Sequence, residues 1–261
     1  MAGNCPPAPD EYLQPAVPGL DQGTARPGEF LRVDRQGGPE EVSSLPTLDE
    51  ELAWYRQGFK HIAGLDEAGR GCLAGPVVAA AVILPLERDC GALFAGVCDS
   101  KQLTPVQRER LYNVILGEAT AVGVGIMPVE EITARNIVGA TRGAMEAAIA
   151  ALAVPPDALL LDALLLPAVP LPQRGLIKGD MRCLSIAAAS IVAKVARDRM
   201  MVELDAQYPG YGFARHKGYA TPEHLRALAR LGPSPIHRPT FEPVRTLLEG
   251  RLELRPCARM L

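Results

Sequence analysis

Three apolar runs in this sequence each end in, or just before, a carboxylate. HIAGLDE ends in Asp66 and Glu67, ALLLD ends in Asp162, and Asp180 follows the run LIKG. Short apolar runs of this kind predict buried β-strands. Desolvating a carboxylate costs several kcal/mol, so a charge at the end of a buried strand needs a partner. The pattern therefore favours a sheet whose strand ends bring several acids together.

Strands alternate with helices along the chain. The pattern predicts strands at 61–67, 75–85, 119–127, 158–162 and 174–179. It predicts helices at 47–57, from 104 onward, and at 129–153, 185–207, 222–231 and 242–251. Thr47 and Thr104 are the expected caps of the first two helices, with Pro105 at the first helical position and Gln107 at capping-box spacing. This order predicts an α/β sheet with a C-terminal helical portion.

The first 45 residues differ in composition from the rest of the chain. Residues 1–45 are rich in proline, glycine and polar groups with no sustained period, which predicts a disordered extension. One domain is expected over 46–251, followed by a tail at 252–261. No apolar run reaches the ~18 to 20 residues of a membrane span, and the N-terminus does not resemble a signal peptide. The six cysteines lack zinc-site spacing, so we expect reduced thiols in a cytoplasmic protein.

The net charge of −3 conceals an asymmetry. Residues 1–58 carry ten acids and four arginines, a charge of −6, which leaves +3 for the remainder of the chain. A mildly basic body with local acidic clusters suits a protein that holds both phosphates and metal ions, although it does not establish either.

The acids that follow the predicted strands are candidate metal ligands. Four carboxylates gathered at one place, Asp66, Glu67, Asp162 and Asp180, would repel each other unless a cation neutralised them. Mg²⁺ or Mn²⁺ is the natural cation, because hard cations prefer oxygen ligands. The alternative is that each acid is a separate turn or cap residue. Sites in open α/β sheets form at the carboxyl ends of strands, which favours the metal site.

Asp66 and Glu67 raise a geometric question of their own. Adjacent strand residues point to opposite faces, so both side chains can serve one site in the same way only if the strand breaks between them. Gly69 and Gly71 make such a break plausible. Glu67 would otherwise offer its main-chain carbonyl, or bind through water.

Eight segments between residues 50 and 245 resemble, in order, the type 2 ribonucleases H, and ribonuclease HII in particular. They are GLDEAGRG at 64–71, AGPVVAAAV at 74–82, DSKQL at 99–103, LLDA at 160–163, KGD at 178–180, SIAAASIVAKVARD at 185–198, HKGYATPEH at 216–224 and GPSPIHRPTF at 232–241. The resemblance implies an RNase H-like mixed sheet flanked by helices, with a C-terminal helical portion. Cys72, where many members have proline, and the N-terminal extension depart from the family pattern. The extension is too short and irregular for the added domain of the ribonuclease HIII relatives.

The resemblance also implies an activity. Members are endoribonucleases that hydrolyse RNA in RNA/DNA hybrids and nick on the 5′ side of single ribonucleotides in duplex DNA, leaving 3′-hydroxyl and 5′-phosphate ends. The family's four acidic positions map onto Asp66, Glu67, Asp162 and Asp180. Two divalent ions per site are expected, Mg²⁺ or Mn²⁺, with Asp66 as the bridging ligand. We expect a monomer whose partners are nucleic acids and which does not bind membranes.

Several further residues are candidates for substrate contact. Gly69, Arg70 and Gly71 are expected to touch sugar and phosphate, and Tyr219 to stack at the RNA–DNA junction. Lys101 is a candidate phosphate ligand. Ser190, Lys194 and Arg197 share the spacing of one helix face, which either follows the DNA backbone, with Asp198 as an ion partner, or is only a solvated charged face. His216 and His237 are expected to be structural or to contact substrate rather than to bind metal.

Three other functions are weighed against this one. A resolvase or integrase-like nuclease would share the acidic cluster but would not need GRG with HKGY. A catalytically silent hybrid-binding protein would be expected to lack one of the four acids. A nucleotide-binding enzyme would be expected to carry a Walker motif or G-x-G-x-x-G, and neither occurs here.

Overall fold

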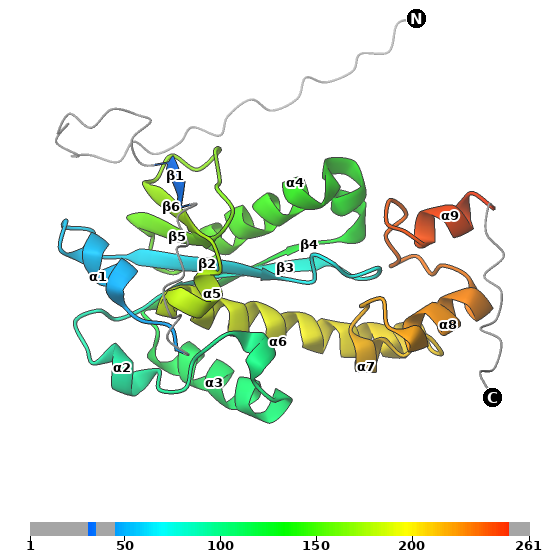
Figure 1. The fold of residues 1–261 in the computed structure, drawn as a ribbon, viewed down its shortest axis with the longest axis horizontal. Coiled ribbons are helices and arrows are strands. Elements are labelled where there is room, and N and C mark those ends of the chain that lie inside the picture. The colour runs from blue at the N-terminus through cyan, green and yellow to red at the C-terminus, as the bar shows by residue number, and fades with distance from the viewer. Residues whose placement is uncertain (1–30, 35–44, 251–261) are drawn as a thin grey trace, which may run out of the picture.

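A six-stranded mixed sheet forms the centre of the molecule (Figure 1). The computed structural model describes residues 31–34 and 45–250. The strand order is β1-β6-β5-β2-β3-β4, in which β1, β6, β5 and β2 run parallel and β3 is antiparallel to both of its neighbours. The strands are β1 (Leu31–Asp34), β2 (Ile62–Ala68), β3 (Val77–Ile83), β4 (Ala121–Met127), β5 (Ala158–Asp162) and β6 (Gln173–Leu176).

Helices cover both faces of this sheet, giving three layers (Figure 1). Helix α4 packs on β3 and β4 from one side, and α6 packs on β2 and β3 from the other, with α3 against α6. The helices are α1 (Asp49–Tyr55), α2 (Cys90–Leu93), α3 (Pro105–Glu118), α4 (Val129–Ala150), α5 (Gly179–Arg182), α6 (Leu184–Gln207), α7 (Phe213–His216), α8 (Pro222–Leu231) and α9 (Val244–Leu248), with a 3₁₀ turn η1 at Ser100–Gln102. None of the described helices is both long and apolar enough to cross a membrane.

Small residues let the helices lie close to the sheet. A Cβ added to Gly64 of β2 would lie 2.3 Å from the backbone of Ser185, so α6 rests directly on this strand. On the opposite face, a Cβ at Gly125 of β4 would lie 2.0 Å from the carbonyl oxygen of Ala144 in α4. Side chains alternate along β3, where Val82 joins the core beneath α6 and Ala81 joins the core beneath α4. The central strands are therefore buried on both faces, as their apolar runs predict.

The predicted succession of elements is confirmed, and several bounds differ. The capping box at Thr104 is present, with its hydroxyl accepting from the Gln107 amide and the Gln107 side chain accepting from the Thr104 amide. Thr47, by contrast, is not the cap of α1, because that helix begins at Asp49 after Leu48. Helix α4 ends at Ala150 rather than at 153, and α9 is shorter than the predicted 242–251.

The fifth predicted strand, at 174–179, is wrong at its carboxyl end. Strand β6 ends at Leu176, and Lys178 adopts left-handed dihedral angles, with φ of 55°. The turn at Lys178 stops the strand and starts α5, which carries Asp180 in its first turn. Asp180 thus reaches the sheet edge from a helix rather than from the end of a strand.

Residues 31–34 correct part of the predicted disordered extension. They form β1, which extends the sheet by pairing with β6, from Leu31 beside Gln173 to Asp34 beside Leu176. Residues 1–30 and 35–44, and the predicted tail at 252–261, lie outside the described part of the chain.

Candidate active site

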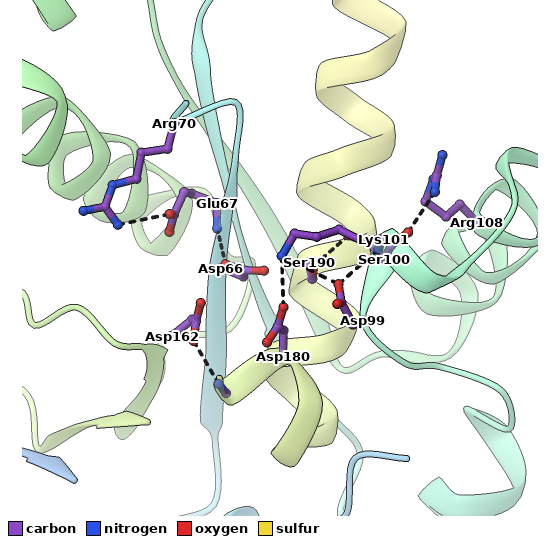
Figure 2. A network of polar contacts seen from close by, with 11 residues as sticks. Asp66, Glu67, Arg70, Asp99, Ser100, Lys101, Arg108, Asp162, Asp180 and Ser190 are labelled. Atoms are coloured by element: carbon purple, nitrogen blue, oxygen red, sulfur yellow. Dashed lines mark hydrogen bonds and ion pairs between the residues drawn. The ribbon is translucent and has the colours of Figure 1, made fainter. Parts of the chain in front are cut away.

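The strand register sets two of the four acids side by side. Leu65 of β2 is paired with Leu161 of the parallel strand β5, so the next residues along these strands are Asp66 and Asp162. Both strands end in this region, and α5 brings Asp180 to it, while the Asp162 carboxylate accepts a hydrogen bond from the Gly179 amide at 2.8 Å. Figure 2 shows Asp66, Glu67, Asp162 and Asp180 together at this edge.

Strand β2 does not break between Asp66 and Glu67, contrary to one sequence-based expectation. Asp66 pairs with Ala80 and Glu67 with Ala79 in an unbroken ladder with β3. The two side chains therefore leave opposite faces of the strand, Asp66 toward α6 and Glu67 toward Arg70 (Figure 2). The Asp66 carboxylate also accepts from the Glu67 amide at 2.7 Å. The two acids reach the region around the end of β2 from its two sides.

Burial and mutual repulsion raise the pKa of three of these acids. The pKa of Asp66 lies well above its usual range, first because the group is buried and then because Glu67 and Asp162 are close. Burial likewise raises the pKa of Glu67, against the opposing charge of Arg70, and raises the pKa of Asp162, with a further contribution from Asp180. Each carboxylate thus feels the negative charge of another, and bringing them together costs free energy that a cation would offset.

Lys101 is the cation nearest to Asp180. Its Nζ lies 3.3 Å from Asp180 Oδ2 and 3.8 Å from Asp99 Oδ1. The Asp180 side chain is 8% exposed while that of Lys101 is 77% exposed, so the ammonium group reaches in from solvent. Asp99 also fixes the lysine backbone by accepting from the Lys101 amide at 3.0 Å. Lys101 therefore lies between two carboxylates, Asp180 and Asp99, and Asp99 belongs to the same DSK motif. Sequence reasoning did not single out Asp99.

The carboxylates at this edge are groups that bind divalent cations. Glu67 Oε2 is buried and has no hydrogen-bond partner among the described residues, although a buried carboxylate oxygen normally has one. Hard divalent cations bind carboxylate oxygens of this kind. Within residues 31–34 and 45–250, no three acidic, histidine or cysteine side chains are already grouped to hold one metal ion. The acids therefore share one edge of the sheet without forming a ready coordination shell.

The GRG segment follows β2 directly. Gly69 has φ of +90°, which favours glycine, and a Cβ there would lie 1.9 Å from Arg197 Nε. The exposed Arg70 side chain lies 3.5 Å from Glu67 Oε1. A Cβ at Gly71 would meet nothing within 4 Å, so the space beside it is open.

Two of the residues predicted to contact substrate lie in the interior. Arg197 is fully buried, and its guanidinium donates to the carbonyl oxygens of Pro76, Lys217 and Ala74. Ser190 is also buried, with its hydroxyl 2.9 Å from that of Ser100. The helix face predicted from residues 190, 194 and 197 is therefore not an exposed charged face. Arg197 supports the loop around the site instead, because burial keeps its charge away from a substrate backbone.

Lys194 and Tyr219 lie next to each other, Lys194 with a largely buried side chain and Tyr219 partly exposed. Lys194 pairs with Asp198 at 2.7 Å, as predicted, and its Nζ lies 5.5 Å from the centre of the Tyr219 ring. The Tyr219 side chain is 40% exposed. Both residues line a cleft of about 400 Å³ between α3, α6 and α7, whose other charged residues are Arg108, Glu109, Asp198, Arg199, Arg215 and Lys217. This cleft gives the molecule a largely basic groove next to Tyr219.

Buried histidines support Tyr219 from below. His224 Nδ1 lies 2.9 Å from the Tyr219 carbonyl oxygen, and its Nε2 lies 3.1 Å from His237 Nε2. The ring of His216 stacks on that of His224 at 4.3 Å. Burial lowers the pKa of His224 and lowers that of His237 to about 4. The three rings are thus packed together and bonded to each other or to backbone groups, and the exclusion of His216 and His237 as metal ligands stays a prediction.

A second buried arginine, Arg238, was missed by sequence reasoning. Its guanidinium donates to the carbonyl oxygens of Gly69, Arg70 and Gly75. The segment GPSPIHRPTF was recognised only as part of the resemblance, because nothing local distinguishes a buried arginine from an exposed one.

Comparison with known proteins places this site in a family. The family model described as Ribonuclease HII matches residues 63–244. The chain is 56% identical over 226 residues to ribonuclease HII of Geobacillus kaustophilus, covering 87% of this chain and 84% of that one. The crystal structure of ribonuclease H2 from Pyrococcus horikoshii OT3 has a TM-score of 0.61 at 30% identity, covering 73% and 98%. That of Bst-RNase HIII in complex with Mn²⁺ has a TM-score of 0.56 at 21% identity, covering 77% and 73%, and shares the fold.

The matched range begins one residue after the start of β2 and includes all four acids, the GRG segment and Tyr219. The chain therefore belongs to the ribonuclease HII family, the metal-dependent endoribonucleases that act on the RNA of RNA/DNA hybrids.

Proposed function

We propose that this protein nicks duplex DNA on the 5′ side of single embedded ribonucleotides and also cuts longer RNA/DNA hybrids, leaving 3′-hydroxyl and 5′-phosphate ends. The observation that supports this most directly is the pairing of Asp66 beside Asp162, with Glu67 and Asp180 at the same edge. Gathering four mutually repelling acids, two of them buried, costs free energy, so their arrangement fits a site that uses bound cations.

Asp66, Glu67, Asp162 and Asp180 are the proposed ligands of two divalent ions, Mg²⁺ or Mn²⁺. Asp66 lies centrally and is proposed to serve both ions, with Asp162 on one side and Asp180 on the other. The Mn²⁺ complex of Bst-RNase HIII, which shares this fold, supports the choice of cation. When bound, such ions activate a water nucleophile and stabilise charge on the phosphate and on the leaving oxygen. A water nucleophile gives the proposed product ends, whereas attack by the 2′-hydroxyl would give a cyclic phosphate.

The surface beside the acids supplies the proposed substrate contacts. Arg70 and Gly71 form an exposed turn next to Glu67, directly after the buried Gly69, and this turn is proposed to contact sugar and phosphate. Lys101 and Lys194 are proposed phosphate ligands, since Lys101 is exposed and Lys194 lines the cleft beside Tyr219. Tyr219 is partly exposed, and its ring is proposed to stack on a nucleotide. Ser190 and Arg197 support this surface from within rather than touching the substrate.

The proposal extends to the state of the protein in the cell. We propose a monomer in the reducing cytoplasm. Four of its cysteines, Cys72, Cys90, Cys98 and Cys183, are buried free thiols in the described part of the chain, which suits such a compartment.

End analysis of the products tests this proposal. A DNA duplex with one central ribonucleotide is incubated with the protein in Mg²⁺, Mn²⁺ or EDTA, and the products are identified by mass spectrometry. A metal-dependent nick on the 5′ side of the ribonucleotide, with 3′-hydroxyl and 5′-phosphate ends, is the expected result. A cyclic phosphate would exclude the proposed nucleophile. Preferential cutting of an all-DNA junction would instead support a resolvase-like enzyme.

A further inference from the structure

Glu51 of α1 supplies a hydrogen-bond acceptor to the N-terminus of α6. Its side chain is fully buried, and its Oε1 accepts from the Ser185 amide at 2.7 Å and from the Cys183 thiol at 3.2 Å. The first N–H groups of a helix lack partners within the helix, and the side chain of the preceding residue commonly accepts from one of them. Cys183 makes no such bond, so another helix provides the acceptor for α6.

The residues at the start of α1 bind the same place through further contacts. The Thr47 amide donates to the Arg182 carbonyl oxygen at 3.0 Å, and the Leu184 amide donates to the Thr47 carbonyl oxygen at 2.9 Å. The Glu50 carboxylate lies 2.7 Å from Arg174 Nη1 and 3.7 Å from Arg182 Nη2. The start of α1 therefore holds the α5–α6 junction, residues 182–185, by hydrogen bonds and ion pairs.

The α5–α6 junction determines where two of the acids lie. Helix α5 has only four residues and no side-chain cap, so its position depends on its neighbours. It contains Asp180, and the amide of its first residue, Gly179, donates to the Asp162 carboxylate at 2.8 Å. The first turn of α6 rests on β2, where a Cβ on Gly64 would lie 2.3 Å from the Ser185 backbone. A shift of this turn would move Asp180 relative to Asp162.

The second carboxylate oxygen of Glu51 makes no contribution of its own. Glu51 Oε2 is buried and has no hydrogen-bond partner among the described residues. A buried polar atom in this state costs stability, which an apolar side chain of similar size would avoid. The contribution of Glu51 therefore lies in the bonds that Oε1 accepts.

We propose that Glu51 is a positioning residue of the active site, whose hydrogen bond from the Ser185 amide fixes Asp180 relative to Asp162 and so sets the affinity for divalent ions. This inference rests on the proposed function, in which both acids are metal ligands. Groups that orient metal ligands without touching the metal commonly govern its affinity.

Two substitutions of similar size isolate the hydrogen bond. Glu51→Gln keeps an oxygen that accepts from the Ser185 amide, whereas Glu51→Met fills the space without an acceptor. Burial raises the pKa of Glu51, so the neutral amide of glutamine is a close substitute. Isothermal titration with Mn²⁺ alone measures the affinity of each protein. We expect Glu51→Met to bind Mn²⁺ about 10- to 100-fold more weakly than wild type, and Glu51→Gln to remain within about threefold.

Unfolding in denaturant separates this effect from lost stability. Met145→Ala, in α4 on the other face of the sheet, is the control, and should lose stability while keeping the wild-type Mn²⁺ affinity. Wild-type affinity in Glu51→Met would show that Glu51 only stabilises the fold, and would overturn the inference. A loss in Glu51→Gln equal to that in Glu51→Met would also overturn it, because the retained acceptor would then have no effect.

A double-substitution cycle connects the effect to Asp180. In Asp180→Asn the positioned ligand is already lost, so adding Glu51→Met should weaken Mn²⁺ binding by less than about twofold more. A full additional loss would show that Glu51 acts elsewhere, and would contradict the inference. If Asp180→Asn binds Mn²⁺ as tightly as wild type, Asp180 is not a ligand, and it is the proposed function that fails.

Hydrogen exchange in the wild-type protein needs no variant to fold. Because coupling is reciprocal, a hydrogen bond that favours metal binding must itself be favoured by the metal. Exchange of the Ser185 amide, followed by NMR, should therefore slow on adding Mg²⁺ by at least about threefold more than exchange of the α4 amides does. The same change at Ser185 and in α4 would show no coupling between this bond and the metal, and the inference would be wrong.

Discussion

Lys101 Nζ lies 3.3 Å from Asp180 Oδ2, so this acid, like Glu67 beside Arg70, already has a side-chain counter-ion. A divalent ion at Asp180 must compete with this ammonium group. Because the lysine side chain is 77% exposed, solvent screens the pair, and its contribution is of the order of 0.2 to 1 kcal/mol. We therefore expect Lys101→Met to bind Mn²⁺ up to about fivefold more tightly in the absence of nucleic acid. Isothermal titration measures this, and Lys101→Arg, which keeps the charge, should match wild type.

Neutralising Asp66 is expected to stabilise the protein in EDTA while abolishing activity. Burial and the charges of Glu67 and Asp162 raise the pKa of this carboxyl, so its ionised form is unfavourable in the folded state. Asp66→Asn removes that charge and should raise the free energy of unfolding by about 1 to 3 kcal/mol at pH 8. Denaturant titration in EDTA measures the difference, and a destabilised variant would contradict the electrostatic account.

The same carboxyl predicts the direction of a pH dependence. The pKa of Asp66 in the folded protein is raised above its value in the unfolded chain. The contribution of this carboxyl to stability is therefore complete below the unfolded pKa and is lost as the pH rises through the folded pKa. In EDTA, the difference between Asp66→Asn and wild type should thus be small near pH 4 and grow toward pH 8. Denaturant titrations at a series of pH values measure it, and a difference independent of pH would exclude Asp66 as the cause.

Acid should weaken the histidine cluster beneath Tyr219. Burial lowers the pKa of His237 from 6.5 to about 4, so the folded state favours the neutral ring. Its contribution to stability is full above pH 6.5 and is lost as pH falls toward 4, by roughly 3 kcal/mol at 1.36 kcal/mol for each pKa unit. His237→Asn, which cannot titrate here, should flatten the fall in stability between pH 6.5 and 4.5. Urea unfolding at both pH values measures the slope, and equal slopes in the two proteins would contradict this assignment.

Removing the Tyr219 ring should weaken use of the single-ribonucleotide duplex. Base–aromatic stacking contributes about 1 to 3 kcal/mol, so Tyr219→Ala should lower kcat/KM by about 5- to 150-fold. Tyr219→Phe keeps the ring and should retain most of the activity. Steady-state kinetics on this duplex and on a long hybrid measure the effect. Equal activity of wild type and Tyr219→Ala on both substrates would show that the ring does not contact nucleic acid.

The sequence alone located the four acids and the layered fold because both depend on local patterns. Continuous apolar runs and Ala-rich helical spacing identify strands and helices, and a carboxylate closing an apolar run is conspicuous. The side-by-side placement of Asp66 and Asp162 depends on the register between β2 and β5. The two apolar runs are compatible with this register but do not determine it. The inner positions of Arg197 and Arg238 could not be predicted, because all but one of the carbonyls that satisfy them lie about 120 to 170 residues away along the chain. Strand β1 was missed for a similar reason, since its partner β6 is remote in sequence.

Single-turnover cleavage by wild type and Asp66→Asn tests the central claim most directly. The substrate is a DNA duplex with one ribonucleotide, with Mg²⁺ in excess and both proteins shown to be folded. The account predicts a nick on the 5′ side of the ribonucleotide by wild type, and a rate at least about 100-fold lower for the variant, because even changes outside the ligand shell cost 10- to 100-fold. A variant that cuts at the wild-type rate would show that the buried carboxylate at the end of β2 does not carry the chemistry.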